Sequence, residues 1–170
     1  MAKKEAPTIN TERLVLRRLT ENDIPAMSKL FGSKKVTKYL AGDTPTPDAR
    51  SMLKLVQARR EHDWAVTLSE TGEYIGQCII ARVTADYLGE IGCLLLPDFW
   101  KKGYAKEALS AVEEYCVNTL NLKRLCARMD NGNGGAKKLF ESLGYELNAV
   151  LPEASFIGRI CDVAYYSKKI

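Results

Sequence analysis

Histidine, paired cysteines and long apolar runs are what this sequence lacks. Its single histidine, His62, lies between charged residues in the run Arg60-Glu61-His62-Asp63. A Ser-His or Cys-His nucleophile would have to use His62, which we expect to be a surface side chain instead. The five cysteines include no Cys-x-x-Cys pair, and most fall within apolar runs. We therefore predict no metal site and interpret the cysteines as reduced core residues.

No apolar run reaches membrane-spanning length, and no secretory signal precedes the first predicted strand. The formal net charge of +4 is modest, and the basic residues are scattered apart from short pairs such as Lys3-Lys4 and Lys34-Lys35. A solvated surface explains that pattern. We therefore predict a cytoplasmic protein that binds neither membrane nor nucleic acid. A small polyanionic cofactor would suit the charge as well.

The length and the hydrophobic pattern predict one mixed domain. We expect a single domain over residues 1–170, with residues 1–10 as a frayed N-terminal segment. We predict strands over residues 14–19, 64–68, 74–83, 90–96 and 122–129, from residue 145, and around residues 163–166. We predict helices from Thr20 to Gly32, from near Thr46-Pro47-Asp48 to near His62, from Ala105 to near Leu120, and over residues 136–143.

The most informative stretch is the run of residues 94–109. An apolar segment ends at Pro97, a short loop holds Lys101, Lys102 and Gly103, and an amphipathic pattern begins at Ala105. A helix start leaves backbone N–H groups without partners, and a glycine there lets a ligand approach the backbone. The pattern predicts a pyrophosphate cradle. Taken alone, it also fits an ordinary turn between a strand and a helix.

The same loop resembles that of a known family. The run Trp100-Lys101-Lys102-Gly103-Tyr104-Ala105 is similar to the acetyl-CoA loop of GNAT acetyltransferases, whose pattern is Gln/Arg-x-x-Gly-x-Gly/Ala. The departure at Trp100 resembles the ribosomal-protein N-terminal acetyltransferase branch, where a Tyr-Trp-Gly-Lys-Gly-Tyr-Ala-like string is usual. Residues 99–105 match that string except that Lys101 replaces a glycine.

A second motif of the family follows at the expected distance. It reads Asn-x-x-Ser, then a short helix and Leu-Gly-Phe. Here Asn133 and the run Leu143-Gly144-Tyr145 resemble it, whereas Ala136 stands at the serine position. A lone Leu-Gly-Tyr indicates only a helix end, but this order and spacing are more specific. The resemblance extends over nearly the whole chain, from about Thr11 to Ser167.

The resemblance implies a GNAT-like α/β (α+β) fold, with a mixed, mostly antiparallel central sheet of about six to seven strands and helices on both faces. It also implies acetyl-CoA as co-substrate and no metal. The implied cofactor-binding residues lie on the strand before the loop, in the loop and on the second motif. They are Cys93, Leu94, Leu95, Lys101, Lys102, Gly103, Tyr104, Ala105, Lys106, Asn133 and Phe140.

The resemblance further implies that an amine attacks the acetyl thioester directly, which requires a proton acceptor. Glu90 is our candidate, because it matches an acidic position often found on this strand in the branch. A solvated carboxylate beside the turn at Gly89 is the alternative. A bulge in this strand would decide which face of the sheet Glu90 takes.

No general acid can be named from the sequence. The family commonly places a tyrosine or serine on the helix of the second motif, where this chain has Phe140 and Ala136, and neither can donate a proton. Tyr104 and Tyr145 are unranked substitutes.

Three functions stay open at this point. The first is acetylation of a protein or peptide N-terminus, as the branch resemblance implies. The second is acetylation of a small amine such as a polyamine, an amino acid or an antibiotic. The third is a non-catalytic acetyl-CoA-binding module, which the missing acid keeps open. The expected partners are acetyl-CoA and an amine acceptor. The sequence is compatible with a monomer or a homodimer.

Overall fold

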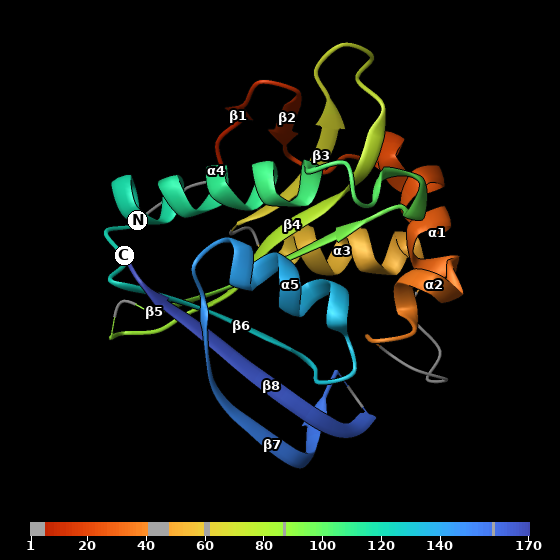
Figure 1. Cartoon of the computed structure of the whole chain (residues 1–170). Coiled ribbons are helices and arrows are strands. Elements are labelled where there is room, and N and C mark those ends of the chain that lie inside the picture. Colours follow the sequence, from red (N-terminus) through yellow and green to blue (C-terminus); the bar gives the residue numbers. More distant parts are fainter. Residues whose placement is uncertain (1–5, 41–47, 60–61, 87, 158) are drawn as a thin grey trace.

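One eight-stranded sheet organises the computed structural model, which describes residues 6–170 apart from 41–47, 60–61, 87 and 158. The strand order is β1-β2-β3-β4-β5-β6-β8-β7 (Figure 1). The neighbouring strands pair antiparallel, except that β5 and β6 are parallel. The strands are β1 Ile9–Asn10, β2 Leu14–Arg17, β3 Asp63–Leu68, β4 Tyr74–Val83, β5 Leu88–Leu95, β6 Arg124–Asp130, β7 Glu146–Phe156 and β8 Arg159–Lys169. The predicted mixed, mostly antiparallel sheet is confirmed.

The predicted count of six to seven strands is wrong by one, and the missed strand is β1. It lies in the segment that we expected to be frayed, yet Ile9 pairs with Leu16 of β2. The indole N–H of Trp64 also donates to the Pro7 carbonyl at 2.7 Å. Residues 7–10 are therefore tied to the sheet, whereas residues 1–5 lie outside the described part of the chain. A two-residue strand is too short to show a period of two in the sequence.

Helices cover both faces of the sheet, as predicted. Helices α4 (Tyr104–Asn118) and α5 (Gly134–Ser142) cover the face that carries the larger core. Helices α1 (Ile24–Gly32), α2 (Lys34–Thr37) and α3 (Ala49–Arg59) pack over a smaller core on the other face (Figure 1). Strand β3 shows the division, because Trp64 and Val66 belong to the larger core and Ala65 between them belongs to the smaller one.

Predicted helix boundaries differ from the structure by one or two residues. Helix α4 begins at Tyr104, one residue before the predicted Ala105, and α5 spans Gly134–Ser142 where we predicted residues 136–143. Helix α3 begins at Ala49, where the Asp48 carboxylate accepts the N–H groups of the first turn, and the predicted start at residues 46–47 lies outside the described ranges. His62 follows α3 and is half-buried, with its ring centroid 5.8 Å from that of Tyr115. Our expectation of a surface histidine is therefore wrong.

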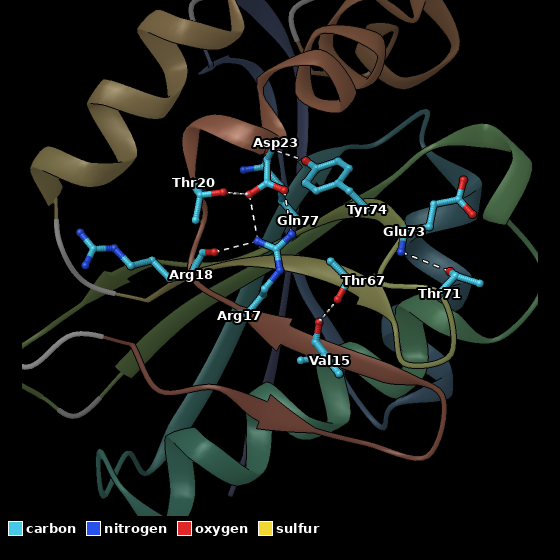
Figure 2. A network of polar contacts seen from close by, with 10 residues as sticks. All are labelled: Val15, Arg17, Arg18, Thr20, Asp23, Thr67, Thr71, Glu73, Tyr74 and Gln77. Atoms are coloured by element: carbon cyan, nitrogen blue, oxygen red, sulfur yellow. Dashed lines mark hydrogen bonds and ion pairs between the residues drawn. The ribbon is translucent and has the colours of Figure 1, made fainter.

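An ion pair fixes the turn from β2 into α1 (Figure 2). The guanidinium of Arg17 binds both oxygens of Asp23, at 2.9 and 2.8 Å, and the Thr20 N–H donates to the same carboxylate at 2.8 Å. Burial alone would raise the pKa of Asp23, but the hydrogen bonds from Arg17 and Thr20 outweigh it and lower the pKa. Asp23 lies in the short 3₁₀ helix η1 (Glu21–Asp23) that leads into α1.

Candidate active site

Strands β5 and β6 pair over a short stretch and then separate. Their parallel ladder joins residues 88–90 to residues 124–126. β5 continues to pair with β4 as far as Leu95, and β6 continues to pair with β8 as far as Asp130. Residues 91–95 and 127–130 therefore diverge, with no ladder bond between them in the described pairing. We call this opening the wedge.

The pairing of β5 with β4 decides which backbone groups face the wedge. The Leu96 N–H donates to the Ile75 carbonyl at 2.8 Å, so residue 96 faces β4. Successive residues of a strand point their N–H groups to opposite sides, so Cys93 and Leu95 face the wedge. The Leu95 carbonyl already accepts the indole N–H of Trp100 at 2.7 Å. The N–H groups of Cys93 and Leu95 are the donors that the wedge offers.

Gly76 allows β4 to lie close against the β5 backbone at this point. A Cβ atom built at Gly76 would lie 2.1 Å from the Leu94 carbonyl oxygen, so no other residue fits without movement of the strand. The contact confirms that the backbone of Leu94 faces β4. Its side chain packs against the smaller core. Of the three strand residues that we predicted to bind the cofactor, Leu94 therefore has no backbone group directed into the wedge.

The loop after β5 exposes the start of α4. It follows the 3₁₀ helix η2 (Pro97–Phe99), and Lys101 and Gly103 both have positive φ angles, of 60° and 83°. The first backbone bond into α4 runs from the Glu107 N–H to the Gly103 carbonyl, and Gly103 provides no side-chain cap. The N–H groups of residues 103–106 thus have no acceptor within the helix, at its positive end. Lys101 and Lys102 are exposed beside them.

Polar side chains from the turn between β1 and β2 hold the loop in place. Arg13 donates to the Lys102 carbonyl at 3.1 Å and forms an ion pair of 2.7 Å with Glu107. Thr11 donates to the same carboxylate at 2.6 Å. Burial alone would raise the pKa of Glu107, but the hydrogen bonds from Thr11 and Arg13 outweigh it and lower the pKa. The guanidinium of Arg13 also lies 4.5 Å from the centre of the Tyr104 ring.

The residues of the second motif have mainly structural roles in the described geometry. Asn133 is the N-cap of α5, and its side-chain oxygen accepts the Ala136 N–H at 3.1 Å. Phe140 is 5% exposed and packs edge-on against Tyr145, at 5.0 Å between ring centroids. Phe140 is thus a core residue, and our prediction that it binds the cofactor gains no support from the geometry. Burial, with Glu113 nearby, raises the pKa of Tyr145 far above that of a free tyrosine.

Glu90 is the last residue of β5 that pairs with β6 before the wedge opens. Its side chain is 14% exposed, and its Oε1 accepts the Nε–H of Arg128 at 2.8 Å. This hydrogen bond raises the pKa of Arg128. The alternative of a solvated turn carboxylate is therefore wrong, because Glu90 lies within a strand and has a cationic partner.

The bulge that we considered for β5 lies in β4 instead, so the alternation along β5 is unbroken at Glu90. The register passes from the pair Ile80 and Ile91 to the pair Arg82 and Glu90, which leaves Ala81 as the extra residue. Since Ile91 belongs to the larger core under α4, its neighbour Glu90 takes the opposite face of the sheet. The bulge also sets Arg82 directly beside Glu90.

A comparison with protein families agrees with this geometry. The model for the acetyltransferase (GNAT) domain matches residues 13–146, a span that includes the wedge, the loop and α5. The chain belongs to the GNAT acetyltransferases. Two of its curated relatives are named as uncharacterized N-acetyltransferases. The protein p20 of Bacillus licheniformis is 31% identical, and the match covers 94% of each chain. The protein YoaA of Bacillus subtilis is 30% identical over 85% of this chain and 86% of its own.

Solved GNAT structures share the fold over almost the full length. A GNAT acetyltransferase from Bacillus anthracis superimposes with a TM-score of 0.86 at 22% identity, covering 96% of this chain and 98% of its own. The ribosomal L7/L12 α-N-protein acetyltransferase RimL, solved with coenzyme A, gives 0.80 at 19%, covering 96% and 98%. The spermidine N-acetyltransferase from Vibrio cholerae, solved with CoA and spermine, gives 0.80 at 21%, covering 94% and 96%.

This GNAT N-acetyltransferase brings together most of the residues that the sequence singled out. Cys93 and Leu95 lie on β5, which leads into the loop, and residues 101–106 run from that loop into the first turn of α4. Sequence reasoning missed Arg13 and Glu107, which support the loop, because the two residues lie 94 positions apart. No helix in the described ranges is long and apolar enough to cross a membrane.

Proposed function

We propose that this enzyme transfers the acetyl group of acetyl-CoA directly to a primary amine, the N-terminus of a protein or peptide. The observation that carries the proposal is the wedge, whose free N–H groups at Cys93 and Leu95 lead to the uncapped start of α4. The N–H groups of the wedge suit an extended chain with amide groups, and those at the start of α4 suit a diphosphate. Acetyl-CoA contains an extended amide-bearing arm and a diphosphate, joined end to end.

The loop would hold the diphosphate through the backbone N–H groups of residues 101–106, with Lys101 and Lys102 adding charge. The pantetheine arm would take the place that the separation of β5 from β6 leaves beside Cys93 and Leu95. Asn133 keeps its amide N–H groups available, since the cap of α5 uses only its oxygen. Acetyl-CoA supplies the thioester carbonyl, which an amine can attack.

The N–H of Cys93 or Leu95 is then placed to stabilise the negative charge that develops on the carbonyl oxygen. The amine nitrogen bonds to the carbonyl carbon, the C–S bond breaks, and the thiolate leaves. A thiol has a pKa of about 8.5, so its thiolate can depart without a protein acid. This accounts for activity despite Ala136 and Phe140, which have no hydroxyl group.

Glu90 would accept the proton that the amine loses. Three residue steps separate it from Cys93 along β5, which is about 10 Å at roughly 3.3 Å per residue. The Glu90 side chain and intervening water would therefore have to bridge that distance, since direct proton transfer needs about 3 Å. The contact with Arg128 orients the carboxylate towards the face of the sheet from which the amine would arrive.

The nature of the acceptor is the part that the comparisons leave open. RimL is named for a protein N-terminus and the Vibrio cholerae enzyme for spermidine, and both superimpose equally well, with TM-scores of 0.80. A small amine is therefore the second candidate. The features of the chain that favour a peptide are the string at residues 99–105, which resembles the ribosomal-protein branch, and a groove beside Glu90 that is lined by Arg82, Arg124 and Arg128.

The test is to follow release of the CoA thiol from acetyl-CoA with a panel of acceptors. The panel holds short peptides with a free α-amine, the same peptides with a blocked α-amine, a polyamine and free amino acids. We expect thiol release with the peptides whose α-amine is free and not with the blocked peptides, the polyamine or the free amino acids, and one acetyl group on the N-terminal residue by mass spectrometry. Binding of acetyl-CoA without transfer to any amine would contradict the proposal. Transfer only to small amines would favour the second candidate.

A further inference from the structure

A groove of about 490 Å³ lies beside Glu90, on the face of the sheet opposite α4. Side chains from β4, β5, β6, β8 and β7 line it. Its charged residues are three arginines, Arg82, Arg124 and Arg128, and a single carboxylate, Glu90. The groove thus runs from Arg82 on β4, past the proposed proton acceptor on β5, and over β6, β8 and β7.

The strand register explains why the three arginines gather there. Arg82 lies opposite Glu90 on β4, and Cys126 lies opposite Glu90 on β6. Arg124 and Arg128 are two residues before and after Cys126, so they share its face. Directly opposite residues are about 5 Å apart and diagonal neighbours about 7–8 Å between their Cα atoms. All three arginines therefore line the same groove as the Glu90 carboxylate, which Arg128 contacts directly.

The charges in the groove do not cancel. Glu90 is paired with Arg128. Neither Arg82 nor Arg124 has a carboxylate partner among the described residues, and both are exposed. A polycationic acceptor would be repelled here, whereas an acceptor with carboxylates near its amine would be attracted.

The extent of the groove favours a peptide over a free amino acid. From β5 across β6 and β8 to β7 there are three strand spacings, or about 14 Å at roughly 4.8 Å each. That length holds about four residues of an extended peptide at roughly 3.3 Å per residue. Tyr165 and Leu151 give the groove apolar surface on which such a peptide can lie.

We propose that the acceptor is an acidic peptide N-terminus, with Asp or Glu among its first four residues bound by Arg82 and Arg124. This inference rests on the proposed function and specifies its substrate class. The α-amine would lie beside Glu90, with Arg82 of β4 on one side and Arg124 of β6 on the other, so that acidic side chains next to the amine could reach both arginines.

The experiment compares three tetrapeptides that begin with the same residue and differ at positions two and three, which carry Glu-Glu, Ala-Ala or Lys-Lys. We measure kcat/KM for acetylation and, separately, the binding of C-terminally labelled peptides by fluorescence anisotropy in the presence of CoA. The enzymes are the parent, the double variant Arg82→Gln/Arg124→Gln, and Lys138→Gln as a control at an exposed position on α5.

For the parent enzyme we expect kcat/KM to be higher for the Glu-Glu peptide than for the Ala-Ala peptide, on the order of tenfold or more, and lowest for the Lys-Lys peptide. The double variant should lose most of that preference, the control should keep it, and rising salt should weaken it. Equal kcat/KM and equal binding for the three peptides would overturn the inference, as would a preference unchanged in the double variant. Those results would leave the proposed function standing if any peptide is acetylated. Failure to bind acetyl-CoA would instead overturn the proposed function and the inference together.

Discussion

The proposed phosphate-binding loop can be tested at Gly103, where the effect of a substitution on CoA affinity can be calculated from the structure. Replacement by Asp introduces a Cβ atom at a φ of 83°, 3.2 Å from a guanidinium nitrogen of Arg13. An L residue in the left-handed region costs about 1–2 kcal/mol. A carboxylate about 5 Å from a phosphate charge costs about 2–3 kcal/mol at an effective dielectric constant near 20–30. The electrostatic cost alone corresponds to roughly a 30- to 150-fold loss of CoA affinity.

The matched control is Gly103→Asn, which has the same shape and tolerates a positive φ but carries no charge. Calorimetry should show a modest loss of CoA affinity for the Asn variant and the full electrostatic loss only for the Asp variant. S-acetylpantetheine, which has no phosphate, should show no difference between the two variants in its KM. If the Asp and Asn variants bind CoA equally well, the phosphates do not lie at the start of α4.

Three further predictions concern the catalytic groups and one buried ion pair. Glu90→Gln keeps an acceptor for Arg128 but removes the base, so kcat should fall about 10²–10⁴-fold with acetyl-CoA affinity unchanged. A kcat that is unaltered across pH would exclude Glu90 as the base. Ala136→Ser should leave acetyl-CoA affinity nearly unchanged in calorimetry and raise kcat if thiolate departure limits the rate. A lower affinity would show that the start of α5 does not tolerate the hydroxyl group. Asp23 has a lowered pKa, so its ion pair stabilises the fold above the unfolded pKa of about 3.9, and this contribution disappears as the pH falls through the folded pKa. Asp23→Asn should lower the free energy of unfolding at pH 7 by about 1.5–3 kcal/mol and flatten its dependence on acid pH, as urea titrations can show. An equally steep acid dependence in the variant would assign that dependence to other groups.

The parts of the fold that the sequence predicted are those with local signals. The helix α4 shows an amphipathic period, and the loop before it contains Gly103 in a position where a positive φ is needed. Strand β1 had no such signal, because two residues acquire an extended conformation only through their partner β2. The bulge at Ala81 was likewise invisible, since it exists only in the register between two strands.

The residues of the candidate site also fall into those with a local sequence signal and those placed by long-range pairing. The loop residues could be identified from their order along the chain, because a cradle of backbone N–H groups is a local structure. The partner of Glu90 could not, since Arg128 lies 38 residues away and reaches it only through the parallel pairing of β5 and β6. Asn133 matched the motif of the family, yet its side-chain oxygen caps α5, a role that spacing alone also allowed. Long-range register determines what such residues contact.

Hydrogen exchange measured by mass spectrometry, with and without CoA, tests most directly the claim that the wedge and the loop form the cofactor site. We expect slower exchange of the amides of Cys93, Leu95 and residues 101–106 when CoA is added, because these N–H groups gain acceptors. The hairpin of β7 and β8 should exchange at the same rate in both samples and serves as the internal reference. Protection confined to that hairpin, or no protection at residues 101–106 at saturating CoA, would contradict the account.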